Sequence, residues 1–109
     1  MSAARIATGI RVAAYLARLG QRTIPAYVIH RGDDTAGAVA VKSARLDGTA
    51  QLWLREWDFQ TDLRQWRAVL EGPERDIDAR IARERAQDRD LWVIEIESRS
   101  GETLLDAME

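Results

Sequence analysis

The stretch Leu91-Trp92-Val93-Ile94-Glu95-Ile96-Glu97-Ser98 decides the fold class, because its apolar residues recur with the period of two that is typical of a β-strand. Three large apolar side chains fall on one face of this strand: Trp92, Ile94 and Ile96. The other face combines Val93 with two carboxylates. A strand with one strongly apolar face requires neighbouring strands and a covering layer, so we expect both elsewhere in the chain.

Further strands are predicted in the first two thirds of the chain. Residues Ala26–Arg31, Ala38–Arg45 and Gln51–Trp57 alternate with the same period, and Asp47-Gly48 predicts a hairpin turn between the last two of them. Residues Asp62–Glu71 fit either a helix or a strand. We favour a strand, because the Glu71-Gly72-Pro73-Glu74 sequence that ends this segment resembles a strand-to-helix turn.

Two helices are predicted, one before and one after these strands. The first covers Thr8–Leu19, with Thr8 as N-cap and Gly20 as the stop. The second runs from Pro73 to about Gln87, with acidic residues early and arginines late, as the helix dipole favours. The apolar stripe of the first helix consists of Val12, Leu16 and Leu19. Its opposite side carries Arg11, Tyr15 and Arg18.

This order of elements predicts an α+β two-layer sandwich, in which a largely antiparallel sheet of four or five strands has both helices packed on one face. We expect one compact domain spanning residues 1–109. The covered face is expected to consist of Tyr27, Ile29, Val39, Val41, Leu52, Leu54, Trp92, Ile94 and Ile96. The open face is expected to carry His30, Lys42, Trp53, Arg55, Trp57, Glu95 and Glu97.

The composition excludes several classes of protein. The chain has 109 residues, of which 46% are hydrophobic and 31% charged, with no cysteine and a net charge of −2. These values do not fit a disulfide-stapled module, a disordered tail or a basic nucleic-acid binder. No apolar run is long enough to span a membrane, and arginines interrupt the N-terminal apolar stretch, unlike in a signal peptide. We therefore expect a cytoplasmic protein that does not bind membranes.

The sequence carries no catalytic motif that we identify. It has no glycine-rich phosphate loop, and a single histidine, His30, without a serine or cysteine at motif spacing. Without cysteine, the usual structural zinc sites cannot form within one chain. We expect no metal, no cofactor and no enzymatic activity. The alternative is a divalent-metal-dependent enzyme that uses Glu95 and Glu97 with the Asp33-Asp34 loop, although such alternating acids more commonly pair with cations across a sheet.

The best candidate for a functional surface is Trp53, Arg55 and Trp57. On a strand these residues share one face, and the two tryptophans lie about 13 Å apart. Tryptophan and arginine are enriched at interaction hot spots, so the leading hypothesis is a protein–protein or homodimer interface. Alternatively, the segment from Phe59 to Leu70 covers the tryptophans. A second candidate surface is the helix stripe of Arg11, Tyr15 and Arg18, where arginines that bind phosphate would permit contact with nucleic acid.

Several separated blocks of the sequence resemble a known family. These blocks are Arg11-Val12-Ala13-Ala14-Tyr15, Ile24-Pro25-Ala26-Tyr27-Val28, Arg31-Gly32-Asp33 with Ala36-Gly37-Ala38, Leu46-Asp47-Gly48-Thr49-Ala50, Glu71-Gly72-Pro73-Glu74 and Asp90-Leu91-Trp92-Val93-Ile94-Glu95-Ile96-Glu97. The family consists of small bacterial proteins of unknown function, and the resemblance spans nearly the whole chain. It implies membership but no activity, cofactor or site residue.

Overall fold

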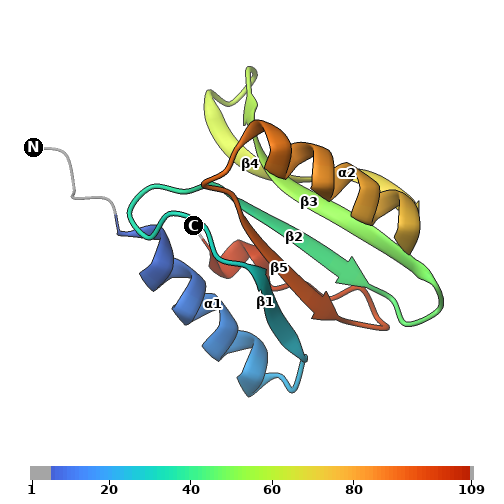
Figure 1. Ribbon diagram of the computed structural model, residues 1–109. Coiled ribbons are helices and arrows are strands. Elements are labelled where there is room, and N and C mark those ends of the chain that lie inside the picture. The colour runs from blue at the N-terminus through green and yellow to red at the C-terminus, as the bar shows by residue number, and fades with distance from the viewer. Residues whose placement is uncertain (1–5, 109) are drawn as a thin grey trace, which may run out of the picture.

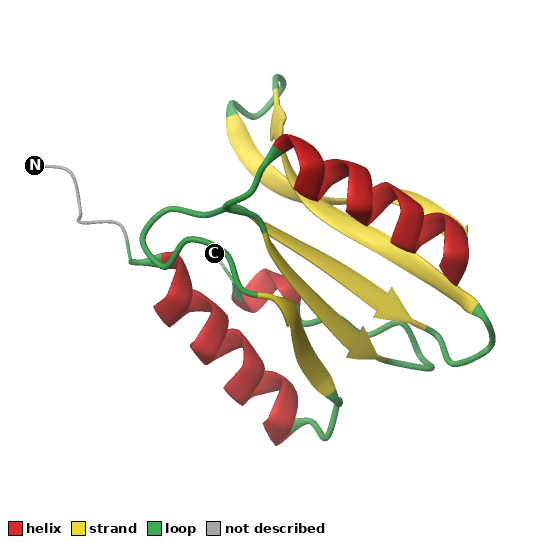
Figure 2. Ribbon diagram, viewed as in Figure 1, coloured by secondary structure: helices red, strands yellow, loops and turns green. Residues whose placement is uncertain are grey.

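The computed structural model describes residues 6–108, which form a five-stranded sheet with one helix against each face (Figure 1). In chain order the elements are α1 (Thr8–Gln21), β1 (Ala26–His30), β2 (Val39–Ala44), β3 (Thr49–Asp58), β4 (Leu63–Pro73), α2 (Glu74–Gln87), β5 (Trp92–Glu97) and the 3-10 helix η1 (Leu105–Ala107). Figure 2 shows these helices and strands by colour. The ambiguous segment from residue 62 to 71 is a strand, as we favoured.

The strand that decides the fold class lies inside the sheet. The strand order is β1-β5-β2-β3-β4, so the last strand of the chain lies between the first and the second. β5 pairs antiparallel with β1 and parallel with β2, and every other pair is antiparallel. These pairings confirm the α+β class and the largely antiparallel sheet of five strands.

The two helices cover opposite faces of the sheet, so the expectation that both pack on one face is wrong. α1 joins one core cluster, made of Val12, Tyr15, Leu19, Val39, Val41, Trp92, Ile94, Ile96, Leu105 and Met108. α2, which crosses the front of β3 and β4 in Figure 1, joins the other, made of Ala40, Ala50, Leu52, Ile77, Ile81, Leu91 and Val93. The physical reason is that the first halves of β2 and β5, Val39-Ala40-Val41 and Trp92-Val93-Ile94, are apolar on both faces, and each apolar face must be shielded from water.

The register of the β2–β3 hairpin also corrects the predicted faces. Val41 pairs with Trp53 and Lys42 pairs with Leu52, so Trp53 lies on the α1 face and Leu52 on the α2 face. We expected the reverse for both residues, and the error extends to Leu54, Arg55 and Trp57 because they alternate with them. A difference of one residue in register exchanges all side chains between the two faces of a strand.

Two more residues of the expected covered face lie in the open. Tyr27 and Ile29 of β1 are 49% and 57% exposed. Tyr27 pairs with Glu95, which places it on the α2 face of the sheet. α2 packs mainly on β2, β3 and β4, so Tyr27 lies beyond the part of the α2 face that the helix chiefly covers.

The N-terminus of α1 is held by the loop between β1 and β2. The N–H groups of Thr8 and Gly9 donate to the carbonyl oxygens of Thr35 (3.2 Å) and Asp34 (2.9 Å). Thr8 is therefore not the N-cap that we predicted; it is the first helical residue, and its hydroxyl donates to the carbonyl oxygen of Gly37 at 2.9 Å. Backbone groups of the loop satisfy the donors that an N-cap side chain would otherwise satisfy.

Lys42 connects three elements on the α2 face. Its ammonium lies 2.9 Å from Glu74 and 2.8 Å from Asp78 of α2, and 3.4 Å from Glu95 of β5. Only 6% of its side chain is exposed. Burial alone would lower the pKa of Lys42, but the hydrogen bonds to Asp78 and Glu74 and the charge of Glu95 outweigh burial, so the pKa lies above its ordinary value.

We predict that Lys42→Met lowers the free energy of unfolding by about 1–3 kcal/mol, because it leaves three partly exposed carboxylates without their shared cation. Lys42→Arg keeps the charge and should lose less than half as much. Urea denaturation at neutral pH measures both differences. A Lys42→Met protein as stable as the wild type would contradict the assigned role of Lys42.

The stabilisation by Lys42 should also depend on pH in one direction. Its pKa is higher in the folded than in the unfolded protein, so the stabilisation is fully present below the unfolded-state value of about 10.4 and is lost as pH rises through the folded-state value. The stability difference between wild type and Lys42→Met should therefore stay constant between pH 7 and about pH 10. A difference that declines within this interval would show that Lys42 is not held as described.

Candidate functional site

The candidate surface lies on the hairpin of β3 and β4, on the α1 face of the sheet. Trp53, Arg55 and Trp57 of β3 share one side of their strand, as the sequence predicted, and this side is the α1 face. Across the pair, Trp57 faces Arg64 and Arg55 faces Trp66. Tryptophans and arginines therefore alternate both along β3 and across to β4. We call Trp53, Arg55, Trp57, Arg64 and Trp66 the hairpin face.

The inner end of the hairpin face is covered by the chain's own C-terminal segment. Trp53 and Trp66 are half-buried and pack against the core cluster that contains Leu105 and Met108. The indole N–H of Trp66 donates to the carbonyl oxygen of Met108 at 3.4 Å. The alternative that the segment from Phe59 to Leu70 folds over the tryptophans is wrong, because β4 lies beside β3 in the sheet.

The outer end of the hairpin face is open. Trp57 is 47% exposed, and beyond it Phe59 and Leu63 are 89% and 62% exposed. We call Trp57, Phe59 and Leu63 the hairpin tip. The sequence analysis singled out Trp57 but not the other two residues. The available signal was a pair of large apolar residues bracketing the polar sequence Gln60-Thr61-Asp62 at a turn.

Two polar atoms within the hairpin face are buried. The Nε of Arg55 and the Nε1 of Trp53 have no hydrogen-bond partner among the residues that the structure describes. Buried donors without partners are costly, and they are rare away from functional or strained positions. Arg55 thus lies between two tryptophans and forms no ion pair with the part of the chain that the structure describes.

The helix stripe of Arg11, Tyr15 and Arg18 does not form one exposed surface. Tyr15 is only 1% exposed, so its predicted place on the outer side of α1 is wrong. Its hydroxyl donates to the carbonyl oxygen of Thr103 at 2.6 Å, and burial raises its pKa. Arg11 donates to the carbonyl oxygen of Met108 at 3.5 Å. Both residues therefore fix the C-terminal segment against α1, a role for which a tyrosine body and a long arginine stem are well suited.

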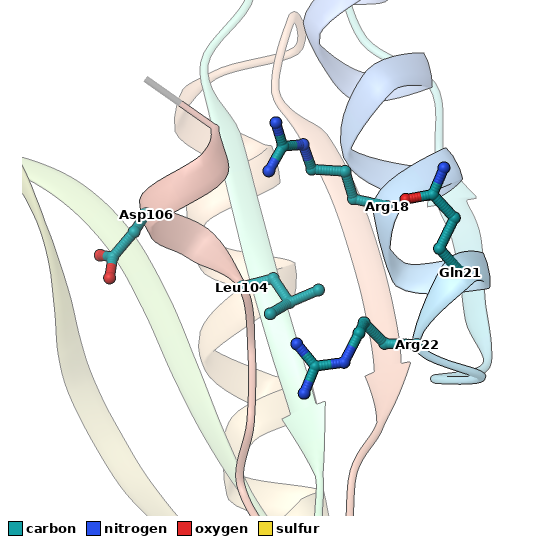
Figure 3. A pocket seen from close by; sticks show the side chains of 5 residues that line it. All are labelled: Arg18, Gln21, Arg22, Leu104 and Asp106. Carbon is teal, nitrogen blue, oxygen red and sulfur yellow. The ribbon is translucent and has the colours of Figure 1, made fainter.

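Arg18 lies at a groove between α1 and the C-terminal segment. The groove has a volume of about 400 Å³ and is lined by Arg18, Gln21, Arg22, Leu104 and Asp106. Figure 3 shows Arg18 of α1 and Arg22, the residue after α1, extending toward the C-terminal segment, with Leu104 between them and Asp106 pointing away. Arg22 forms an ion pair with Glu102 at 2.8 Å. Of the two arginines at the groove, Arg22 is therefore already paired with an acid of the chain itself.

The acids proposed for a metal site are not brought together. Glu95 is in contact with Lys42, and Asp34 forms an ion pair with Arg31 at 2.8 Å. Within residues 6–108, no three residues of the types that bind metals are grouped to hold an ion. The arrangement offers no support for the metal-dependent enzyme.

Comparison with known proteins gives the family. Residues 6–106 match the family model described as "Protein of unknown function (DUF1491)". The chain belongs to the DUF1491 family. No activity is assigned to this family. None of the curated proteins matches the chain.

Solved structures of similar proteins share the fold. The crystal structure of a DUF1491 family protein from Caulobacter crescentus CB15 is 37% identical, with 92% of each chain covered and a TM-score of 0.79. An NMR structure of a DUF1491 family protein from the same organism is 36% identical over 93% of each chain, with a TM-score of 0.78. The solution structure of a protein from A. tumefaciens is 29% identical over 93% of this chain and 92% of that one, with a TM-score of 0.76.

The arginines of this DUF1491 chain do not gather into one basic groove. Arg22, Arg31, Arg67 and Arg80 each lie within 4.0 Å of an acid of the chain, on four different elements or loops. A nucleic-acid surface instead concentrates cations along the path of the backbone phosphates. Among the described helices, none is both long and apolar enough to cross a membrane.

The two ends of the hairpin face should differ in their contribution to stability. We predict that Trp53→Ser lowers the free energy of unfolding by about 2–4 kcal/mol, because it removes a large side chain packed on the core. Trp57→Ser should cost less than about 1 kcal/mol, as for other exposed positions. Chemical denaturation of the two variants tests this. Equal losses would mean that Trp57 serves the fold and is not available to a partner.

Proposed function

We propose that this DUF1491 protein acts by binding another protein chain through the outer end of its β3–β4 hairpin. The observation that carries the proposal is the exposure of Trp57, Phe59 and Leu63 on one projecting element. Large aromatic and aliphatic side chains in contact with water are unfavourable in the free protein. Trp57 and Leu63 lie on opposite faces of the hairpin, and exposure of several such residues within one short segment is typical of surfaces that a partner covers.

The composition of the hairpin face supports a protein partner. Interface hot spots are enriched in tryptophan and arginine, and the hairpin face alternates these two residue types. Trp57 is a large side chain with a polar N–H, and Arg64 beside it is exposed. Together they supply apolar contact area and hydrogen-bond donors, which is how the core and the rim of an interface divide their roles.

The proposal includes a cytoplasmic location, which suits a chain without cysteine. It covers two kinds of partner, a second copy of this chain and a different protein. Homo-oligomers are the commoner case among soluble assemblies. The experiment below distinguishes the two kinds of partner by the mass of the product.

A photo-crosslinking amino acid at position 59 tests the proposal in living cells of the source organism. We expect illumination to give a discrete covalent product, because Phe59 is the most exposed side chain of the hairpin tip. Position 87, which is exposed on α2, is the matched control and should give none. Adding Trp57→Ser should reduce the product at position 59 several-fold.

Mass spectrometry of the product then identifies the partner. A product with the mass of two copies indicates a homodimer, and any other discrete mass indicates a different protein. The proposal fails if position 59 gives no product or gives the same products as position 87. A product that persists undiminished in the Trp57→Ser background would also contradict it.

A further inference from the structure

A second group of exposed apolar side chains lies on α1 and β1, away from the hairpin. Of the nine large apolar side chains that are exposed among the described residues, three form the hairpin tip and one lies between β2 and β3. The other five are Ile6, Ile10, Tyr27, Val28 and Ile29. Figure 1 shows α1 running alongside β1, at the edge of the sheet opposite β4, and the two elements are in contact. Exposed apolar residues are normal singly, but a group of them marks a surface that another molecule covers.

The outer side of α1 carries no charge. Its exposed residues follow one another at intervals of four, three and four positions, which places them on one stripe of the helix: Ile6, Ile10, Ala13 and Ala17. Arg11 and Arg18 do not interrupt this stripe, because both are directed to the C-terminal segment. The exposed side of α2 carries the charges that are usual on a solvated helix, namely Arg75, Asp76, Asp78, Arg83 and Arg85. α1 therefore differs from α2 in lacking a solvated face.

β1 offers an open and uncharged strand edge beside this stripe. The N–H of Glu97 donates to the carbonyl oxygen of Pro25 at 2.9 Å, so Pro25 and Tyr27 direct their backbone groups toward β5, whereas Ala26 and Val28 direct theirs away from it. No backbone hydrogen bond between described residues uses these outward groups. Edge strands commonly carry charges that prevent pairing, but residues 24–30 contain no aspartate, glutamate, lysine or arginine.

The strand edge alone is too small to hold a partner. The bulge between Val28 and His30 limits the regular part of the edge to Ala26–Val28, so an added strand gains only a few hydrogen bonds. A stable interface buries about 800 Å² on each partner. The 14 residues of α1 form a helix about 21 Å long, and its apolar stripe supplies further area. An occupant of this surface therefore has to contact β1 and α1 together.

We propose that a second copy of this chain occupies the surface, with β1 pairing antiparallel to the same strand of the copy and the two α1 helices packing against each other. A two-fold axis perpendicular to the sheet produces this strand pair and keeps both α1 helices on the same face, next to each other. A second copy thus supplies a strand for β1 and a helix for α1 at the same time. The two five-stranded sheets become one continuous sheet.

An interface around a two-fold axis requires a surface that is complementary to itself. On the α2 face, Tyr27 and Ile29 meet the same residues of the second copy, and cross-strand pairs of aromatic and β-branched side chains are favourable. On the α1 face, Ala13 and Ala17 are small enough for two helix axes to approach to about 8–10 Å. Neither element brings like charges together, so nothing in this surface repels a second copy.

This inference goes beyond the proposed function and does not depend on it. β1 and β4 are the opposite edges of the sheet. The two hairpin tips therefore lie at the two ends of the joined sheet, where each remains open to a partner of its own.

Sedimentation of the full chain from about 1 μM to about 1 mM tests the proposal, because dissociation constants of small interfaces fall in this range. We expect the mass to rise from one copy to two. Ala17→Glu should weaken the dimer at least tenfold, because two carboxylates would meet near the axis. Position 17 is exposed and glutamate favours helices, so the fold should persist, which thermal unfolding checks. Ala79→Glu, at an exposed position of α2, is the matched control and should leave dimerisation within twofold.

Hydrogen exchange of the wild-type protein locates the contact without a variant. The outward amide of Val28 should exchange more slowly as the protein concentration rises, whereas the amides of β4 that face away from β3 should not. The proposal is overturned if the wild type stays monomeric throughout, if Ala17→Glu and Ala79→Glu behave alike, or if the dimer leaves the Val28 amide unprotected. A dimer that Trp57→Ser abolishes and Ala17→Glu preserves would place the contact at the hairpin tip and would also overturn it.

Discussion

The structure depends on β5 being buried on both faces in the interior of the sheet. Trp92, Ile94 and Ile96 contribute to the α1 core, while Val93 contributes to the α2 core. Each side of β5 is also paired, with β1 on one edge and β2 on the other. Because β5 is the last strand in the chain, the sheet cannot be completed until α2 has returned the chain from the far edge. Both helices are needed to exclude water from the strand that joins the two halves of the sheet.

The exposed hairpin tip follows from the limited reach of the two helices. α1 and the C-terminal segment fill the α1 face over β1, β5 and β2, and they extend only to Trp53 and Trp66 on the hairpin. α2 occupies the other face and has its closest associations with β3 and β4. The hairpin continues past both covers, and its tip exposes Trp57, Phe59 and Leu63. The tip carries large apolar side chains like those of a core, but neither helix covers them. This exposure is the physical basis for proposing that a partner covers the tip.

The period-two pattern predicted the strands and the α+β class, but it did not predict which face each strand would cover. The pattern determines which residues of one strand share a side. It does not determine which sides of two neighbouring strands form the same face of the sheet, because that depends on their register. The register puts Trp53 opposite Val41 and so reverses the face that we expected for β3. The continuous apolar runs Val39-Ala40-Val41 and Trp92-Val93-Ile94 were the available signal that both faces would be covered. Tyr15 was placed on the outer side of α1 with Arg11 and Arg18, but it is buried, and the Thr103 carbonyl accepts the hydrogen bond of its hydroxyl inside the protein. Trp53, Arg55 and Trp57 were predicted together correctly, because their shared side depends only on their own strand.

The outer end of the hairpin is open in the isolated chain, and the proposed partner would cover it in the cell. The chain has four tryptophans in different surroundings, and Trp57, at 47%, is the most exposed of them. Fluorine NMR of the protein labelled with 5-fluorotryptophan reports each of them separately, in buffer and inside living cells. In buffer, the Trp57 signal should respond most strongly to exchange of water for D2O, while the signal of Trp92, which is 2% exposed, should not respond. In cells, the Trp57 signal should shift or broaden relative to that of Trp92. A Trp57 signal that is shielded in buffer, or four signals that keep the same relative positions and widths in cells, would contradict the account.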